Sequence, residues 1–315
     1  MKNRSIMFSS FGRGMSLSLL LCISAVTVFA QDTNSQLFSV YSDNSMPAQS
    51  AACYGDYLIQ VKTYVSKMSL YNLRSKNMLY VRELSPLKER RGTADIFHAN
   101  NCSFGVHKFK DSDVFPLLYV SHRENNDNRG VLQVYRILPE KSQSDKNDFD
   151  NFSVILVQTI YYPPMTDENA LGSPWTAIDQ ENNCMYVYSR NNRKESVNKG
   201  KCRISQFRIP PFGQSREVYL SDADILDSYE VDFNAALSQG ACVYGGMMYI
   251  GQGKPSSKSL NIRVVDLKQK KLIKTINLKK AGFTSEPEGC FIYNNNLMIS
   301  TAGKRIFKIN IPLYK

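Results

Sequence analysis

The sequence predicts an all-β protein, a five-bladed β-propeller, from three observations. Short runs in which apolar and polar residues alternate at the two-residue period of a strand recur through the chain. Turn residues separate these runs, and no segment keeps a helical period for more than about two turns. A strand-like run near the N-terminus has no partner within its own unit. With 315 residues, 43% of them hydrophobic and 21% charged, the composition supports a large core and argues against disorder or a coiled coil.

An internal repeat defines the blades. Each copy is a short apolar strand that meets a turn and then a second strand. The copies span residues 51–59, 101–120, 176–188, 240–250 and 289–299. In the last two copies, Gly245-Gly246 and Asn294-Asn295 supply the turn of a tight hairpin. The copies align on Cys53, Cys102, Cys242 and Cys290, whereas Cys184 of the third copy follows the turn.

Further strands complete each unit. Third strands are expected at residues 68–73, 132–137, 204–209, 262–267 and 306–311, and outer strands at 80–84, 153–161, 217–220 and 271–278. The last unit has no outer strand of its own. The spare strand at 36–41 is expected to complete it, which closes the ring and removes an open sheet edge. Six blades and a β-sandwich are the alternatives, and residues 220–237 leave room for one short helix.

The first thirty residues predict a signal peptide. Lys2, Arg4 and Arg13 precede an apolar run at 15–30, which is shorter than the about 20 residues of a spanning helix. Cleavage after Ala30 would leave 31–315 as a single domain, exported to the periplasm, the cell surface or the medium. An uncleaved anchor is one alternative, and a lipoprotein modified at Cys22 is another, although Leu21 stands where a small residue would be needed. No other segment is long and apolar enough to span a bilayer.

Charge and cysteine content limit the partners. The chain carries +11, of which the leader contributes three positive charges, so +8 remains as a moderate basic excess spread along the chain. Export argues against nucleic acid, and attraction to anionic glycans or wall polymers stays open. Six cysteines follow the leader, with no CxxC pair and no zinc-ligand spacing to histidine. They are expected to be free and buried, with disulfides as the alternative, and no metal or cofactor is expected.

A resemblance to a known family rests on the fourth and fifth units. Ser238-Gln239-Gly240 opens one blade, residues 261–267 form its third strand, and Glu286-Pro287-Glu288-Gly289 opens the next. Over residues 238–311 the chain resembles the five-bladed propellers of teichoic-acid-biosynthesis-associated proteins and of receptor-binding proteins of some phages. That resemblance implies a binding or structural module and supplies no catalytic residues. Insertions at 140–152 and 190–199 depart from the family pattern.

The predicted site is a ring of polar residues at one mouth of the channel. Equivalent positions of a radial repeat face one axis, so the residues just before each inner strand should gather there. The ring contains Gln49, His98, Asn100, Trp175, Gln239, Glu286 and Glu288. Amide and carboxylate groups suit sugar hydroxyls, and an indole ring can stack on a pyranose. The structural alternative is that these side chains cap strand ends.

Function follows as two hypotheses. The first is a non-catalytic exported propeller that binds a glycan, a wall polymer or a protein at this mouth. The second is a carbohydrate-active hydrolase or lyase in which Glu286 or Glu288 acts as acid or base, with His98 as a further candidate. The dipeptide Gln239-Gly240 also resembles five-bladed glutaminyl cyclases, although the rest of that pattern is missing. The sequence contains no nucleophile elbow, phosphate loop or HExxH motif.

Overall fold

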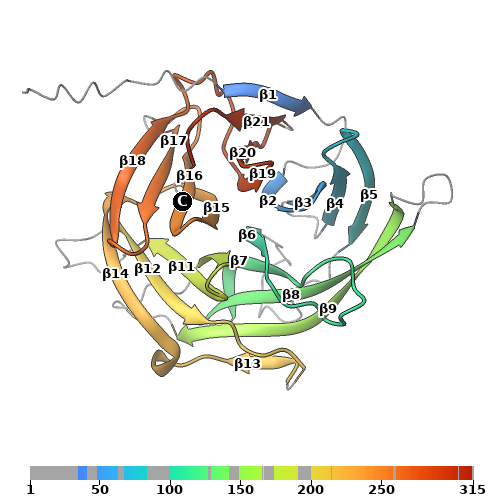
Figure 1. The fold of residues 1–315 in the computed structure, drawn as a ribbon. Coiled ribbons are helices and arrows are strands. Elements are labelled where there is room, and N and C mark those ends of the chain that lie inside the picture. The colour runs from blue at the N-terminus through green and yellow to red at the C-terminus, as the bar shows by residue number, and fades with distance from the viewer. Residues whose placement is uncertain are drawn as a thin grey trace, which may run out of the picture. The chain divides into compact units, whose positions relative to one another are not determined.

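Five sheets surround one axis, and each is a blade of the predicted propeller (Figure 1). The computed structural model describes residues 35–40, 48–62, 67–83, 99–126, 129–141, 149–164, 166, 174–190, 200–213, 215–257, 260–303 and 305–313. The predicted leader lies outside these residues. Asp32–Lys315 form one compact unit that contains all five sheets. The prediction of an all-β, five-bladed propeller is confirmed.

In blades 1 to 4 the innermost strand comes first in sequence and the next three strands of the blade follow outward. Blade 1 contains β2 (Ala48–Tyr54), β3 (Tyr57–Lys62), β4 (Lys67–Asn72) and β5 (Asn77–Glu83). Blade 2 contains β6 (Ala99–Phe104), β7 (Leu118–Asn126), β8 (Arg129–Lys141) and β9 (Phe149–Pro164). Blade 3 contains β10 (Trp175–Asp179), β11 (Cys184–Arg190), β12 (Lys201–Arg208) and β14 (Ile225–Asn234). Blade 4 contains β15 (Ser238–Tyr244), β16 (Met247–Gly253), β17 (Leu260–Asp266) and β18 (Lys271–Asn277).

The N-terminal strand closes the ring, as predicted. Blade 5 contains β19 (Gly289–Tyr293), β20 (Asn296–Ser300) and β21 (Arg305–Ile309), and its outer strand is β1 (Ser35–Val40). β1 pairs antiparallel with β21, and Ser35 lies opposite Ile309. The chain end therefore covers an edge that blade 5 would otherwise expose, which is the usual way a propeller avoids open edges.

The outer strand of blade 3 differs from the prediction. The segment β13 (Glu217–Tyr219) pairs in parallel with β9 of blade 2, and β14 takes the outer position in blade 3. Val231 and Phe233 of β14 are buried against blade 4, which fixes this strand by packing rather than by proximity in sequence. The helix expected within 220–237 is limited to one 3-10 turn at Asp222–Asp224. Among the described residues, no helix is long and apolar enough to cross a membrane.

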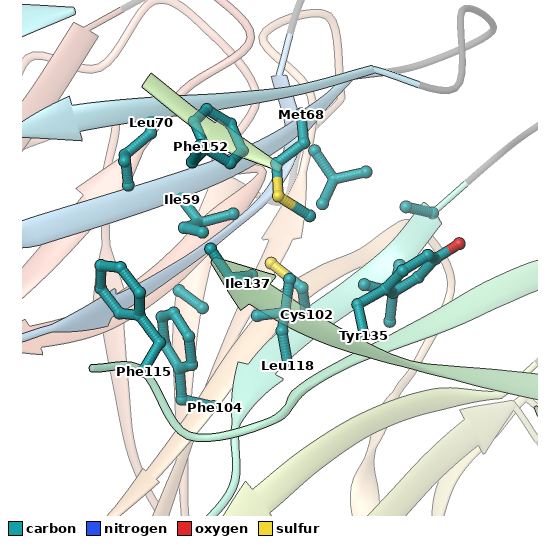
Figure 2. Packing of buried hydrophobic residues seen from close by; sticks show 14 of the residues in the cluster. Ile59, Met68, Leu70, Cys102, Phe104, Phe115, Leu118, Tyr135, Ile137 and Phe152 are labelled. Carbon is teal, nitrogen blue, oxygen red and sulfur yellow. The ribbon is translucent and has the colours of Figure 1, made fainter. Parts of the chain in front are cut away.

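Apolar clusters between blades hold the ring together. Figure 2 shows the cluster between blades 1 and 2, in which Phe152 of β9 lies against Met68 and Leu70 of β4. Phe152 falls in the stretch that looked like an insertion, but here β8 and β9 continue outward and their apolar residues cover blade 1. Each such buried side chain contributes about 1.5–3 kcal/mol by leaving water.

The six described cysteines are free, and four are buried as predicted, whereas Cys53 and Cys242 are half-buried. They are also not equivalent in register. Cys53 lies one residue pair before its hairpin turn, Cys242 two pairs before it and Cys290 three pairs before it. The repeat is therefore a repeat of strands and turns, and aligning the copies on cysteine is wrong by one or two residues.

Candidate functional site

The central channel has two ends of different chemistry. The five inner strands contact one another in a closed ring, and contacts such as Gly240 N to Glu288 O join equivalent residues of neighbouring strands. The inner strands therefore share one direction around the axis. We call the end where they begin the mouth, which is formed by Gln49, Asn100, Trp175, Gln239, Glu286 and Glu288. We call the opposite end, where they finish, the thiol end. His98 lies outside the described residues.

Glu286 and Glu288 form a carboxyl pair that two glutamines hold in place. Nε2 of Gln49 donates to Oε2 of Glu288 at 2.9 Å, and Nε2 of Gln239 donates to Oε2 of Glu286 at 3.4 Å. Burial raises the pKa of Glu288 well above its usual value, and a hydrogen bond with Glu286 and the charge of that residue raise it further. Burial and the neighbouring carboxyl group therefore both favour the protonated form of Glu288.

Two glycines explain the position of this pair. A Cβ at Gly240 would overlap the carbonyl oxygen of Glu288, to which the backbone N of Gly240 donates at 3.1 Å. A Cβ at Gly289 would lie 2.7 Å from the backbone N of Ala51. Glycine at both positions lets the inner strands of blades 4, 5 and 1 approach closely. This close approach brings Gln239, Glu288 and Gln49 together from three blades.

Trp175 and Asn100 lie at the starts of the inner strands of blades 3 and 2. The ring of Trp175 is half-buried and stacks on Tyr188, with centroids 5.7 Å apart and planes at 21°. The hydroxyl of Tyr188 donates to the carbonyl of Gln239, which links the aromatic pair to blade 4. Asn100 is buried and donates from Nδ2 to the carbonyl of Pro174 at 2.8 Å. Within the described residues no hydrogen bond joins Asn100 or Trp175 to the carboxyl pair, and the amide of Asn100 connects blades 2 and 3.

Asn101 separates the mouth from the thiol end. Its Nδ2 donates to the carbonyls of Thr176 and Ala241 at 2.7 and 2.9 Å. Its Oδ1 accepts from the backbone N of Ala241 at 3.1 Å and from Oγ of Ser50 at 3.2 Å. One fully buried side chain thus joins the inner strands of four blades across the axis. Sequence reasoning missed this residue, because an asparagine beside Asn100 carries no local sign of a partner 140 residues away.

A cavity of about 110 Å³ lies at the thiol end. Residues of all five inner strands line it, among them the thiols of Cys53, Cys102, Cys242 and Cys290. Burial raises the pKa of Cys53, Cys102 and Cys290 to about 12. The thiols are therefore neutral at physiological pH, and no charged residue is among those that line the cavity. Among the described residues, no group of three His, Cys, Asp or Glu side chains could hold a metal ion.

Comparison with known proteins identifies the fold and no family. No family model and no curated protein matches the chain. The structure is similar to glutaminyl cyclase from Myxococcus xanthus, with a TM-score of 0.51 and 11% identity over 90% of this chain and 98% of that one. It is also similar to the PQQ-bound aldose sugar dehydrogenase from Streptomyces coelicolor (TM-score 0.44, 9% identity, 88% and 97% covered). A third similar structure is the Cps50 (Swd1) β-propeller domain from Myceliophteria thermophila (TM-score 0.41, 9% identity, 84% and 83% covered). At these identities the likeness shows a propeller fold alone, and the resemblance to teichoic-acid-associated and phage proteins stays a prediction.

Proposed function

We propose that this chain is an exported β-propeller whose mouth binds a polyhydroxylated ligand, a glycan or wall polymer of the cell envelope, without turning it over. Export rests on the predicted leader. The observation that carries the proposal is the hydrogen-bonded group of Gln49, Gln239, Glu286 and Glu288, which comes from three blades and lies at the mouth that Trp175 shares.

The chemistry of this group suits hydroxyl groups. A sugar hydroxyl both donates and accepts, and the mouth offers amide donors and carboxyl oxygens as acceptors. Gln49, Gln239 and Glu286 are half-buried, so they keep surface for a ligand, whereas Glu288 is buried beneath them. Trp175 is half-buried as well and has Tyr188 stacked on it. An aromatic ring fixed in this way suits stacking on a pyranose face.

The carboxyl pair supports binding over two-carboxylate glycoside hydrolysis. In glycosidases the two carboxyl groups are about 5–5.5 Å apart in retaining enzymes and about 6.5–9.5 Å apart in inverting ones, because the scissile bond lies between them. Glu286 and Glu288 share a hydrogen bond. A pair in direct contact leaves no room for a glycosidic bond between its members.

A hydrolase or lyase that uses the pair as one acid/base unit is the alternative. A buried carboxyl with a raised pKa beside a carboxylate is also an arrangement found in active sites. Glu286→Gln separates the two functions, because it keeps the shape and removes the charge. Binding alone predicts a modest change in affinity and no turnover in either protein. An acid/base role predicts turnover in the unmodified protein that the variant loses while binding persists.

The binding experiment can use the protein's own fluorescence, because Trp175 is the only tryptophan. Soluble oligosaccharide fragments of cell-wall polymers are titrated, and quenching or a spectral shift reports the mouth directly. Trp175→Ala, measured by calorimetry, is expected to weaken binding by roughly 1–3 kcal/mol, the scale of a truncated aromatic anchor. Trp175→Phe keeps an aromatic ring and should lose less. Affinity that is unchanged in Trp175→Ala would contradict the proposal.

A further inference from the structure

We propose that the outer edge of blade 4 is a second binding surface, and that it takes a linear polyanion with phosphate or sulfate groups at regular intervals. We call this surface the basic edge. Its described lysines are Lys254, Lys268, Lys270, Lys271, Lys274, Lys279 and Lys280.

The segment that contains the basic edge, residues 238–285, accounts for the whole net charge of the chain after its first thirty residues. Residues 238–285 contain nine Lys and Arg and a single acidic residue, Asp266. That excess equals the +8 of residues 31–315, so the remainder of the chain is neutral. The basic excess is therefore concentrated in one blade, whereas sequence reasoning treated it as a general property of the chain. A concentrated charge of one sign attracts an oppositely charged partner much more strongly than a dispersed one.

The fold places six of these lysines along or directly beside one strand at the rim, whereas Lys254 directly follows β16. β18 is the outermost strand of blade 4 and lies at the outside of the ring (Figure 1). Lys268, Lys270 and Lys271 are exposed at its start, Lys274 is half-buried in the middle, and Lys279 and Lys280 are exposed just after its end. A strand of seven residues is about 23 Å long, so the charges extend along a narrow line of that length.

Most of these lysines have no internal counter-charge. Lys270 pairs with Asp227 at 2.7 Å, and Nζ of Lys279 donates to the carbonyl of Ser257 at 2.7 Å. Within the part of the chain that the structure describes, no ion pair or hydrogen bond engages the side chains of Lys254, Lys268, Lys271, Lys274 and Lys280.

In the neighbouring blade 3, the charged residues of the outer strand are paired within the protein. β14 of blade 3 carries three acidic residues, and each has a basic partner. Asp227 pairs with Lys270, Glu230 with Arg203 at 3.9 Å, and Asp232 with Lys201 at 3.2 Å. The outer edge of blade 3 is therefore neutralised within the protein, whereas the basic edge is not.

The shape of the basic edge favours a chain over a bilayer. An anionic membrane binds best to a broad basic face with apolar anchors. Here the charges follow one strand, and the exposed neutral residues of that strand are Thr275 and Asn277. Leu272 and Ile273 are half-buried and pack toward neighbouring blades. A flexible polyanion can follow such a line and release its counterions as each lysine engages a charged group.

The test uses long-chain inorganic polyphosphate, with free phosphate and phosphatidylglycerol vesicles as comparisons. The triple variant Lys268→Glu, Lys271→Glu, Lys280→Glu reverses three exposed positions of the basic edge. A matched control reverses three exposed positions elsewhere: Lys110→Glu, Lys141→Glu, Arg216→Glu. Both variants lower the net charge equally, and thermal unfolding checks that both remain folded.

We expect the unmodified protein to bind polyphosphate with an affinity that falls steeply with salt. The basic-edge variant should bind polyphosphate at least about tenfold more weakly, whereas the affinity of the control should change less than about threefold. In the basic-edge variant, the slope of log affinity against log salt concentration should become shallower by about one unit per lysine removed. Equal losses in the two variants would overturn the proposal, because net charge alone would then explain binding. Tighter binding to the vesicles than to polyphosphate would overturn it in favour of a membrane, and no binding to polyphosphate at physiological salt would overturn it outright.

Discussion

The two ends of the channel are built by the same five inner strands, yet their chemistry is opposite. The mouth has carboxyl and amide groups that hydrogen-bond between blades, as in Gln49 to Glu288 and Gln239 to Glu286. The thiol end has neutral thiols, apolar side chains and a small cavity. Asn101 lies between them and joins four blades.

The difference follows from where each end lies along the strand. The chain enters each inner strand from a connection between blades, and there Glu286-Pro287-Glu288 and the residues around Gln239 need polar partners for their backbone. Each inner strand leaves through a hairpin into its own blade, so the backbone is already paired and the side chains can be apolar. One propeller therefore offers a polar surface at one end of its axis and an uncharged one at the other.

The largest expected effect on stability comes from removing the side chain of Asn101, which lies between the mouth and the thiol end. Asn101→Ala should lower the free energy of unfolding by about 4 kcal/mol, because it breaks hydrogen bonds to three other blades and leaves their buried partners unsatisfied. Urea unfolding measures the loss. Asn100→Ala is the matched control, because within the described residues its side chain has one hydrogen bond, to the carbonyl of Pro174, and the expected loss is about 1 kcal/mol. Equal losses in the two variants would mean that Asn101 does not bridge the channel.

The second prediction concerns the reactivity of the thiol end. At pH 7.5 iodoacetamide should label Cys102 and Cys290 at least about 100-fold more slowly in the native protein than in urea, because a raised pKa and burial leave little accessible thiolate. Mass spectrometry of time points gives the rate at each cysteine. Cys53, which is half-buried, should react before Cys102. Native labelling of Cys102 as fast as that of Cys53 would show that the cavity opens more widely than this structure does.

The third prediction is that the mouth and the thiol end change the stability of the protein in different pH ranges. A carboxyl whose pKa is raised by folding binds more protons in the native state, so stability falls as pH rises from about 4.3, the unfolded pKa of glutamate, through the native pKa of Glu288. The thiol end follows the same sign at higher pH, from about 8.5 for an unfolded cysteine up to about 12.

The test compares the unmodified protein with Glu288→Gln by urea unfolding at a series of pH values. The variant keeps an oxygen acceptor for Gln49 and cannot ionise, so it should lose the decline in stability that begins above about pH 4.3. It should keep the decline above about pH 8.5 that comes from the thiols. Parallel pH profiles in the two proteins would show that Glu288 does not titrate as its buried position requires.

The sequence by itself determined the blades, because period-two alternation and turn residues such as Gly245-Gly246 and Asn294-Asn295 are local signals. It also determined the seam: a last unit with three strands and a spare N-terminal strand has one way to close. Among the predicted mouth residues, hydrogen bonds join Gln49 to Glu288 and Gln239 to Glu286. Ligand binding by these residues is still a prediction.

The tertiary structure alone decided the features that depend on partners far away in the chain. Val231 and Phe233 make β14 the outer strand of blade 3 because blade 4 buries them, so 217–219 is left to join β9 of blade 2. Asn101 joins four blades because of contacts with residues far away in the chain, and no local pattern indicates them. For the same reason the sequence does not show that Glu288, rather than Glu286, is the buried carboxyl. Alternation fixes which face of a strand turns inward, but burial and hydrogen bonding across the axis depend on how closely the blades approach, and that distance is set only when all five are in place.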